Sequence, residues 1–219
     1  MNETRSFAFF DFDGTMIPGD SIAAYVRYAR ELGVMSRKEF GKAMGMAAGY
    51  LLGRVSAAES KNAALAFRRR LYERDRETLD RDFVRDRLLP RVYPQARACI
   101  QRHAREGRGI VIVTASTENY MRFAAEALGA DALLATPLKP DGTVGENCRG
   151  EEKIRRVREW LESQGMDADF SRCWAYGDSK SDLPMLRLCG HSVQVNPKRA
   201  LRKAAPDMER ETWGKNGIG

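Results

Sequence analysis

Residues 7–10 are continuously apolar and run straight into the acidic turn Asp-Phe-Asp-Gly-Thr at residues 11–15. An apolar run of this length is typical of a strand that is covered on both faces, as in a parallel sheet. Asp11 and Asp13 are two residues apart, so their side chains lie on the same side at the strand's carboxyl end, where open parallel sheets bind ligands. Two adjacent carboxylates repel each other unless a cation lies between them, and oxygen ligands suit Mg²⁺. The sequence favours a cation site here over a plain surface turn.

Two further apolar runs also end in polar residues. Residues 109–114 are rich in β-branched side chains and lead through Thr114-Ala115-Ser116 into a helix expected at about residues 118–129. A hydroxyl at a strand end, beside the free N–H groups of a helix start, can bind phosphate oxygens, although Ser116 could equally be an N-cap. Residues 173–176 form a third apolar run, followed by the turn Gly-Asp-Ser-Lys-Ser-Asp at 177–182. The two carboxylates of that turn can place one group at a metal and the other behind it.

A basic residue for the same site is expected near the start of a later helix, at about residues 151–164. Lys153 lies in its first turn, after a Pro-Asp-Gly turn at 140–142 that can close a small hairpin. A fixed ammonium would neutralise a nucleophilic carboxylate and the oxygens of a phosphoryl group. By spacing alone, Arg155, Arg156 and Arg158 are equal candidates.

Residues 16–92 read as an all-helical segment. Apolar side chains follow helical spacing at residues 22–32, and Ser36 and Ser56 each begin a capping box that opens a further helix, to Leu52 and toward Tyr72. A fourth helix is expected to end before Pro90. The segment carries 16 Lys and Arg against 10 Asp and Glu, so it holds six of the chain's seven net positive charges. This charge can steer anions toward a cleft or belong to solvated helix faces.

The bulk composition indicates an ordinary globular protein, with 43% hydrophobic and 31% charged residues. The sequence shows no signal peptide and no apolar run long enough to cross a bilayer, so we expect a cytoplasmic protein. Its four cysteines have no metal-ligand spacing and are expected to be reduced. The two histidines, His103 and His191, are too few for a His-rich metal site and are expected to be structural. The tail from Pro206 is polar and is expected to be frayed, with Trp213 as its one docking residue.

Taken together, these motifs resemble the haloacid dehalogenase (HAD) superfamily, most of whose members are Mg²⁺-dependent phosphatases. The resemblance rests on Asp-Phe-Asp-Gly-Thr at 11–15, Thr114 after the second strand, Lys153 near a helix start, and Gly-Asp-x-x-x-Asp at 177–182. The helical segment is similar to the small cap of the subfamily that contains phosphoserine phosphatase. The implied fold is a doubly wound parallel α/β core of residues 1–15 and 93–219, with a helical cap at 16–92.

The resemblance also implies a two-step mechanism. Asp11 attacks phosphorus, and Asp13 donates a proton to the leaving oxygen and later takes one from the water that hydrolyses the aspartyl phosphate. Mg²⁺ is held by Asp11, the Asp13 carbonyl and Asp178. The implied activity is hydrolysis of a small phosphorylated metabolite.

Further roles follow from the same resemblance. Thr114, the Ala115 amide and Lys153 hold the phosphoryl oxygens, while Asp182 orders Lys153 and metal-bound water. Phosphoserine phosphatase typically carries Ser-Gly-Gly after the second strand and Glu in the early cap, whereas this chain has Ala115-Ser116 and Asp20. The substrate is therefore left open among phosphoserine, histidinol phosphate, a lipid phosphate and others. Asp20 is a candidate substrate contact, or simply an N-cap.

Two other functions remain as alternatives. Phosphoryl transfer to an alcohol would keep every catalytic residue and change only the acceptor. A non-enzymatic module could instead use the basic helices to bind nucleic acid or an anionic membrane. No nucleic-acid partner is expected, because the helices lack interleaved aromatic and basic residues and carry ten acids of their own.

Overall fold

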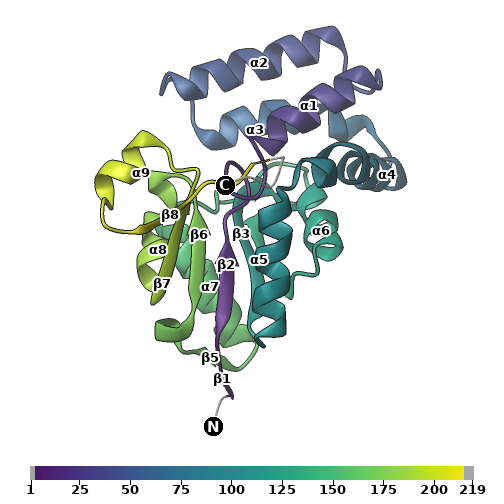
Figure 1. The fold of residues 1–219 in the computed structure, drawn as a ribbon. Coiled ribbons are helices and arrows are strands. Elements are labelled where there is room, and N and C mark those ends of the chain that lie inside the picture. The colour runs from purple at the N-terminus through teal and green to yellow at the C-terminus, as the bar shows by residue number, and fades with distance from the viewer. Residues whose placement is uncertain (1–2, 215–219) are drawn as a thin grey trace.

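The computed structural model describes residues 3–214, which form a parallel sheet flanked by helices, with further helices lying across the sheet's carboxyl edge (Figure 1). The six strands are ordered β4-β3-β2-β6-β7-β8 and all pair in parallel. They are β2 (Phe7–Phe10), β3 (Gly109–Thr117), β4 (Ala132–Thr136), β6 (Trp174–Gly177), β7 (His191–Val195) and β8 (Glu209–Glu211). The predicted doubly wound α/β fold is confirmed.

Strand β2 lies in the middle of the sheet, between β3 and β6, and all four of its residues are buried. Side chains alternate along a strand. Phe7 and Phe9 belong to the hydrophobic core on one face, and Ala8 and Phe10 to the core on the other. The chain runs from β2 to β3 and β4 on one side, and then returns to β6, β7 and β8 on the other. The carboxyl end of β2 therefore lies at the switch point of the strand order, where such sheets bind ligands.

Helices cover both faces of this sheet. One hydrophobic core includes residues of α5 and α6, and the other includes residues of α7, α8 and α9. The helices are α5 (Pro94–Arg105), α6 (Glu118–Ala127), α7 (Glu151–Ser163), α8 (Leu183–Leu188) and α9 (Arg199–Ala204). Short strands β1 (Glu3–Arg5) and β5 (Met166–Ala168) pair in a separate two-stranded sheet. Within the described residues, no helix is long and apolar enough to cross a membrane.

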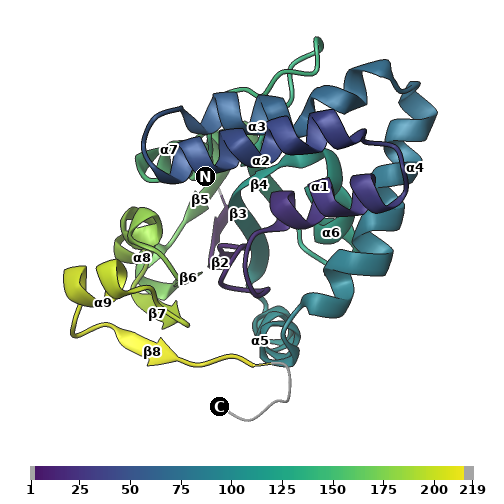
Figure 2. The same cartoon turned by 90° about the horizontal axis from the view of Figure 1, so that it is seen from above.

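The helices between β2 and α5 lie over the carboxyl edge of the sheet, as Figures 1 and 2 show. We refer to them as the cap. They are α1 (Ser21–Glu31), α2 (Arg37–Leu51), α3 (Ala57–Leu65), η1 (Ala66–Arg70), α4 (Glu73–Phe83), η2 (Val84–Leu88) and η3 (Leu89–Arg91). The capping boxes at Ser36 and Ser56 are present, each with its Glu three residues later. The cap therefore follows the sequence pattern closely at its helix starts.

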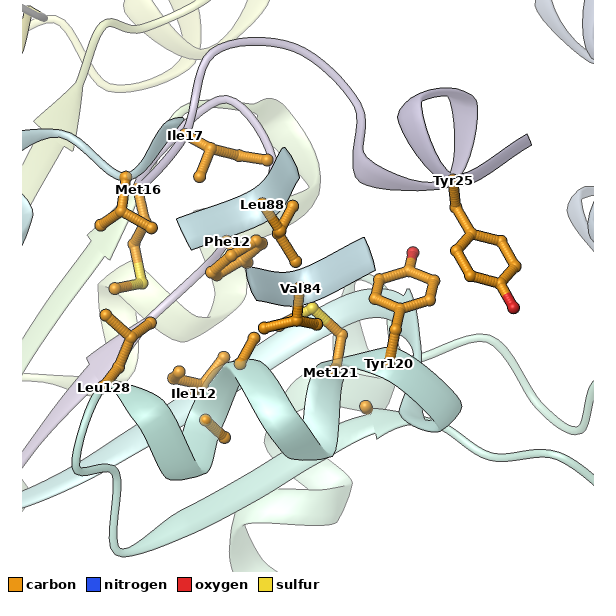
Figure 3. Close-up of a cluster of buried hydrophobic side chains, with 14 of the residues drawn as sticks. Phe12, Met16, Ile17, Tyr25, Val84, Leu88, Ile112, Tyr120, Met121 and Leu128 are labelled. Carbon is orange, nitrogen blue, oxygen red and sulfur yellow. The ribbon is translucent and has the colours of Figure 1, made fainter. Parts of the chain in front are cut away.

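The cap has two parts that meet the rest of the protein differently. The cap root comprises α1, α4 and η2, whose buried side chains join one hydrophobic cluster with Phe12, Ile112 and α6 (Figure 3). The cap tip comprises α2 and α3, which pack against each other and against α1. In α2 only Ala43 is fully buried. The root is thus a large part of the hydrophobic core, whereas the tip joins that core through only three buried side chains, those of Ala43, Ala64 and Leu65.

Four expectations from the sequence need correction. The third cap helix ends at Leu65, where a 3₁₀ turn replaces the expected α-helix up to Tyr72, and the fourth continues into the π-helical turn η2. Strand β3 continues past Thr114 to Thr117, with a register shift against β4 in between. The tail is not frayed up to Trp213, because β8 pairs with β7 and the Trp213 ring is buried. Strands β1 and β5 carried no signal that the sequence analysis recognised.

Candidate active site

Asp11 follows β2 directly and is fixed by three neighbours. Its backbone N–H donates to the Tyr176 carbonyl at 2.9 Å, which ties the residue to β6. One carboxylate oxygen accepts a hydrogen bond from the Thr15 hydroxyl at 3.0 Å, and the other accepts one from Lys153 Nζ at 2.6 Å. The residue is only 7% exposed. The carboxylate is therefore held in one orientation at the switch point of the sheet.

Lys153 bridges two carboxylates. Its Nζ lies 2.6 Å from Asp11 Oδ1 and 2.7 Å from Asp182 Oδ1, and the side chain is buried. The second oxygen of Asp182 accepts hydrogen bonds from the Ser179 N–H and hydroxyl. The structure thus places Lys153 between the turn after β2 and the turn after β6. Arg155, which spacing alone allowed at this position, instead pairs with Glu146, Glu152 and Glu159.

Negative charge exceeds positive charge in this cluster. Asp11, Asp178 and Asp182 each offer a carboxylate oxygen, and these oxygens lie within 4.8 Å of one another. Burial, together with the neighbouring Asp182 carboxylate, raises the pKa of Asp11 to about 7 despite its Lys153 partner. Burial also raises the pKa of Asp178, although Lys198 Nζ lies 2.7 Å from its Oδ2. For Asp182 the contacts from Lys153 and Ser179 outweigh burial, so its pKa lies below the usual value.

This donor set fits a magnesium ion. Buried carboxylate oxygens with uncompensated charge are the ligands that a small hard cation prefers. Gly14 leaves room for the cluster, because a Cβ at this residue would lie 2.2 Å from Asp178 Oδ2. Its φ of +86° also favours glycine. The geometric cluster includes Asp182, which the sequence analysis placed behind the metal, and it does not include the carboxylate of Asp13.

The Asp13 carboxylate lies in a different environment, among hydroxyl groups. It accepts hydrogen bonds from the Ser21 N–H at 2.8 Å, from the Ser21 hydroxyl at 2.9 Å, and from the Ser116 hydroxyl. Burial, with a further contribution from Asp20, raises the pKa of Asp13 to about 6. Two carboxylates that are two residues apart therefore differ in partners: Asp11 has an ammonium, and Asp13 has neutral donors.

The Thr114–Ser116 segment near the carboxyl end of β3 is largely buried and held by several hydrogen bonds. The Ser116 N–H donates to Thr114 Oγ1 at 3.0 Å, so the Thr114 hydroxyl keeps its own proton for another acceptor. The Ala115 carbonyl accepts hydrogen bonds from the Thr136 hydroxyl at 2.7 Å and from Lys61 Nζ. A hydroxyl donor thus stands within the same strand-end region as Asp11 and Asp13.

Three further residues around this site were not predicted from the sequence motifs. Ser21 begins α1, Tyr120 hydrogen-bonds the Ser21 hydroxyl at 2.9 Å, and Lys61 reaches the Ala115 carbonyl from α3. Ser21 had a local signal, since it is the hydroxyl residue directly after Asp20. Asp20 itself is exposed and is the N-cap of α1, accepting a hydrogen bond from the Ala23 N–H at 2.9 Å. The contact of Lys61 joins residues 54 positions apart and has no local signal.

Comparison with known proteins places this chain among phosphatases. The family model of haloacid dehalogenase-like hydrolases matches residues 8–187. A probable phosphatase of Mycobacterium tuberculosis is 32% identical over 92% of this chain and 72% of its own length. A histidinol-phosphatase of Neisseria meningitidis is 27% identical over 93% of this chain and 96% of its own. A solved phosphoserine phosphatase, described as a phospho-aspartyl intermediate analogue, is 17% identical with a TM-score of 0.60, covering 94% of this chain and all of its own.

Proposed function

Because this chain belongs to the haloacid dehalogenase-like hydrolases and is a phosphatase, we propose that it hydrolyses a small phosphomonoester with Mg²⁺ through an aspartyl phosphate. The observation that carries this proposal is the buried bridge of Lys153 between Asp11 and Asp182, with Asp178 in the same cluster. A mere structural ion pair would not leave an excess of carboxylates at the ligand edge of a parallel sheet. Residues 16–92 are proposed as the domain that covers this site.

In the first step, an oxygen of the Asp11 carboxylate attacks phosphorus in line with the ester bond. The new bond joins Asp11 to phosphorus, and the bond from phosphorus to the leaving oxygen breaks. Asp13, whose pKa of about 6 allows it to carry a proton, donates that proton to the leaving oxygen. The products are the free alcohol and the phosphorylated aspartate.

In the second step, a water molecule attacks the phosphorus of the aspartyl phosphate. Asp13, now ionised, takes a proton from the water as the bond between Asp11 and phosphorus breaks. Inorganic phosphate leaves, and the Asp11 carboxylate is restored with its Lys153 partner. The hydrogen bonds from Ser21 and Ser116 hold the Asp13 carboxylate in reach for both transfers.

The remaining groups stabilise charge on the phosphoryl oxygens. Lys153 and the Thr114 hydroxyl are the donors proposed to contact them, together with the Ala115 amide. A magnesium ion held by Asp11, Asp178 and the Asp13 carbonyl would neutralise part of this charge and align the phosphoryl group. Asp182 is proposed to act through Lys153, whose Nζ it holds at 2.7 Å. The cap excludes bulk water, because Asp11, Thr114 and Lys153 are all buried beneath it.

The identity of the leaving group is set by the cap. The relatives include a histidinol-phosphatase, and the solved neighbours include a phosphoserine phosphatase, so the shared feature is a phosphomonoester of a small metabolite. Two charged residues of this part of the chain interact with Asp13. The charge of Asp20 raises the pKa of Asp13, and the charge of Asp13 favours the protonated form of Lys61. Asp20→Ala should change the ranking of substrates if Asp20 contacts the leaving group, and only lower stability if it is an N-cap.

The experiment that tests this function is a panel of phosphomonoesters assayed with Mg²⁺ and with EDTA. At least one ester should release inorganic phosphate with Mg²⁺, and EDTA should abolish the release until Mg²⁺ is restored. Asp178→Asn should raise the Mg²⁺ concentration needed for half-maximal activity, because it removes a charged ligand. Full turnover in EDTA would contradict the metal dependence, and an unchanged Mg²⁺ titration in Asp178→Asn would contradict the ligand assignment.

A further inference from the structure

One ammonium group of the cap tip reaches the strand ends. Lys61 extends from α3, and its Nζ donates to Asn147 Oδ1 at 2.6 Å and to the Ala115 carbonyl. The Thr136 hydroxyl lies 3.4 Å from the same nitrogen. Lys61 therefore joins the cap tip to two core segments at once: the loop before α7 and the Thr114–Ser116 segment of β3.

The Ala115 carbonyl belongs to the peptide unit whose N–H is that of Ser116. That N–H donates to Thr114 Oγ1 at 3.0 Å. Because a peptide unit is planar, fixing its carbonyl also fixes the direction of its N–H. A continuous path therefore runs from Lys61 through the 115–116 peptide to the Thr114 hydroxyl, which is the proposed phosphoryl donor. Strand β3 shifts register in this region, so its pairing with β4 does not fix this peptide by a regular ladder.

We propose that Lys61 is a positioning residue that orients the Thr114–Ser116 segment, which binds the phosphoryl group, when the cap is closed. This inference rests on the proposed function, because it assumes that Thr114 contacts a phosphoryl oxygen. It makes binding of the phosphoryl group depend on the cap tip, whatever the leaving group is. The catalytic groups Asp11, Asp13 and Lys153 need no contact with Lys61 for this effect.

Two other contacts of the cap tip separate this role from simple closure. The Val144 N–H donates to Asn62 Oδ1 at 2.8 Å, and Arg149 Nη1 donates to the Tyr50 hydroxyl at 2.5 Å. Both hold the tip to the loop between β4 and α7, as Lys61 does through Asn147. Neither contact involves the Thr114–Ser116 segment. If Lys61 only closed the cap, loss of Asn62 would have the same consequence as loss of Lys61.

The charge around Lys61 agrees with a position near the reacting groups. Asp13, Asp20 and the Cys148 thiol favour its charged form, whereas burial and Arg149 oppose it. Burial prevails and lowers the pKa of Lys61 to about 8. Its hydrogen bonds to oxygen acceptors of the core offset part of the cost of burying the charged group. A lysine that served only solubility would lie in water.

The experiment uses the full chain and compares Lys61→Met, Lys61→Arg, Thr136→Val and Asn62→Ala. Inhibition by inorganic phosphate and by orthovanadate is measured with the best aryl and the best alkyl ester from the panel, with kcat and KM for each. Lys61→Met should weaken inhibition by both anions about tenfold, the size of one charge-assisted hydrogen bond. KM should rise by a similar factor for both esters. Lys61→Arg keeps a donor and should recover part of the loss.

Thr136→Val removes the core-side hydrogen bond to the same carbonyl, so it should weaken anion inhibition in the same direction. This variant keeps the test valid if Lys61→Met folds poorly. Asn62→Ala should leave anion inhibition within twofold of the unaltered protein. If Asn62→Ala weakens anion inhibition as much as Lys61→Met does, the proposal is overturned and Lys61 only helps to close the cap. If Lys61→Met raises KM for one ester alone, the proposal is also overturned, and Lys61 contacts the leaving group instead.

Failure of this inference is distinguishable from failure of the proposed function. If the unaltered protein hydrolyses phosphomonoesters with Mg²⁺ but Lys61→Met and Thr136→Val bind phosphate and vanadate normally, only the role of Lys61 is overturned. If the unaltered protein releases no phosphate from any ester, the proposed function is overturned and this inference with it.

Discussion

The cap root and the cap tip cover the same edge of the sheet but differ in how much of their attachment is apolar. The root shares aromatic packing with the core: Tyr25, Phe83 and Tyr120 have ring centroids 5.0 to 5.3 Å apart, and Tyr120 belongs to α6. The tip has a smaller apolar contact with the core, through Ala43, Ala64 and Leu65. It adds polar contacts to the core at Lys61, Asn62 and Tyr50. Separating an apolar contact costs free energy because it exposes apolar surface to water. Separating a polar contact costs less, because each group can form a hydrogen bond to water instead.

This difference explains how a buried site can admit a substrate. Asp11 and Thr114 are at most 7% exposed, so we propose that the cap moves before an ester reaches them. Separating the root would expose large aromatic side chains at a high cost in free energy. Opening the tip would exchange a few hydrogen bonds and expose a few smaller side chains, of which Leu65 is the largest. The root is therefore expected to act as the fixed attachment and the tip as the moving part.

The largest effect is expected in the aromatic root. Phe83→Ala should lower the free energy of unfolding by about 3–5 kcal/mol, because the fully buried ring leaves a cavity against Tyr25 and Tyr120. Phe40→Ala on the half-buried side of the tip is the matched control and should cost clearly less. Urea denaturation of both variants measures the difference. Equal costs would show that the tip is as firmly packed as the root.

A somewhat smaller effect is expected from the buried ion pair of the root. Arg68 pairs with Asp80, which also accepts hydrogen bonds from the Tyr25 hydroxyl at 2.6 Å and Asn119 Nδ2 at 2.9 Å. Asp80→Ala should cost about 3 kcal/mol, because it leaves the Arg68 charge buried without a partner. Glu77→Ala, which breaks an exposed pair with Arg81 on the same helix, should cost about 0.5 kcal/mol or less. Denaturation midpoints that differ little between the two variants would argue against a buried polar anchor in the root.

The smallest effect is a pH dependence that belongs to the tip. The pKa of Lys61 is about 8 in the folded protein and near its ordinary value of 10.5 when unfolded. Between these values the unfolded chain binds more protons than the folded one, so this residue makes stability rise as pH increases from about 8 to 10.5. Relative to Lys61→Met, the unaltered protein should gain about 2 kcal/mol between pH 8 and pH 10 in urea denaturation. Parallel pH curves for the two proteins would show that the pKa of Lys61 is not lowered by burial in the folded protein.

Local sequence patterns predicted the parts of the molecule that are fixed locally. The continuous apolar run of residues 7–10 predicted a buried strand, and the capping boxes at Ser36 and Ser56 predicted the starts of two helices. The strand-end positions of Asp11 and Asp178 predicted that both would meet at the switch point. These expectations hold because hydrophobic period and helix capping depend on residues only a few positions apart.

Other features depend on contacts between distant residues, and the sequence did not reveal them. Strand β8 is polar and short, so only its pairing with β7 makes it a strand. The environment of Asp13 depends on Ser116, which is 103 positions away, and the role of Lys61 depends on a carbonyl of β3. Ser21 alone had a nearby signal, because it follows the N-cap Asp20.

The most direct test of the account is whether Asp11 becomes phosphorylated during turnover. Enzyme mixed with Mg²⁺ and a ³²P-labelled ester, then quenched in acid within milliseconds, should carry a phosphate that is released by hydroxylamine and maps to the peptide of Asp11. Asp11→Asn should lose both the label and turnover, whereas Asp13→Asn should slow alkyl esters more than activated aryl esters, which need less protonation of the leaving oxygen. Turnover that survives in Asp11→Asn, or a label on another acidic residue, would contradict the roles of both aspartates.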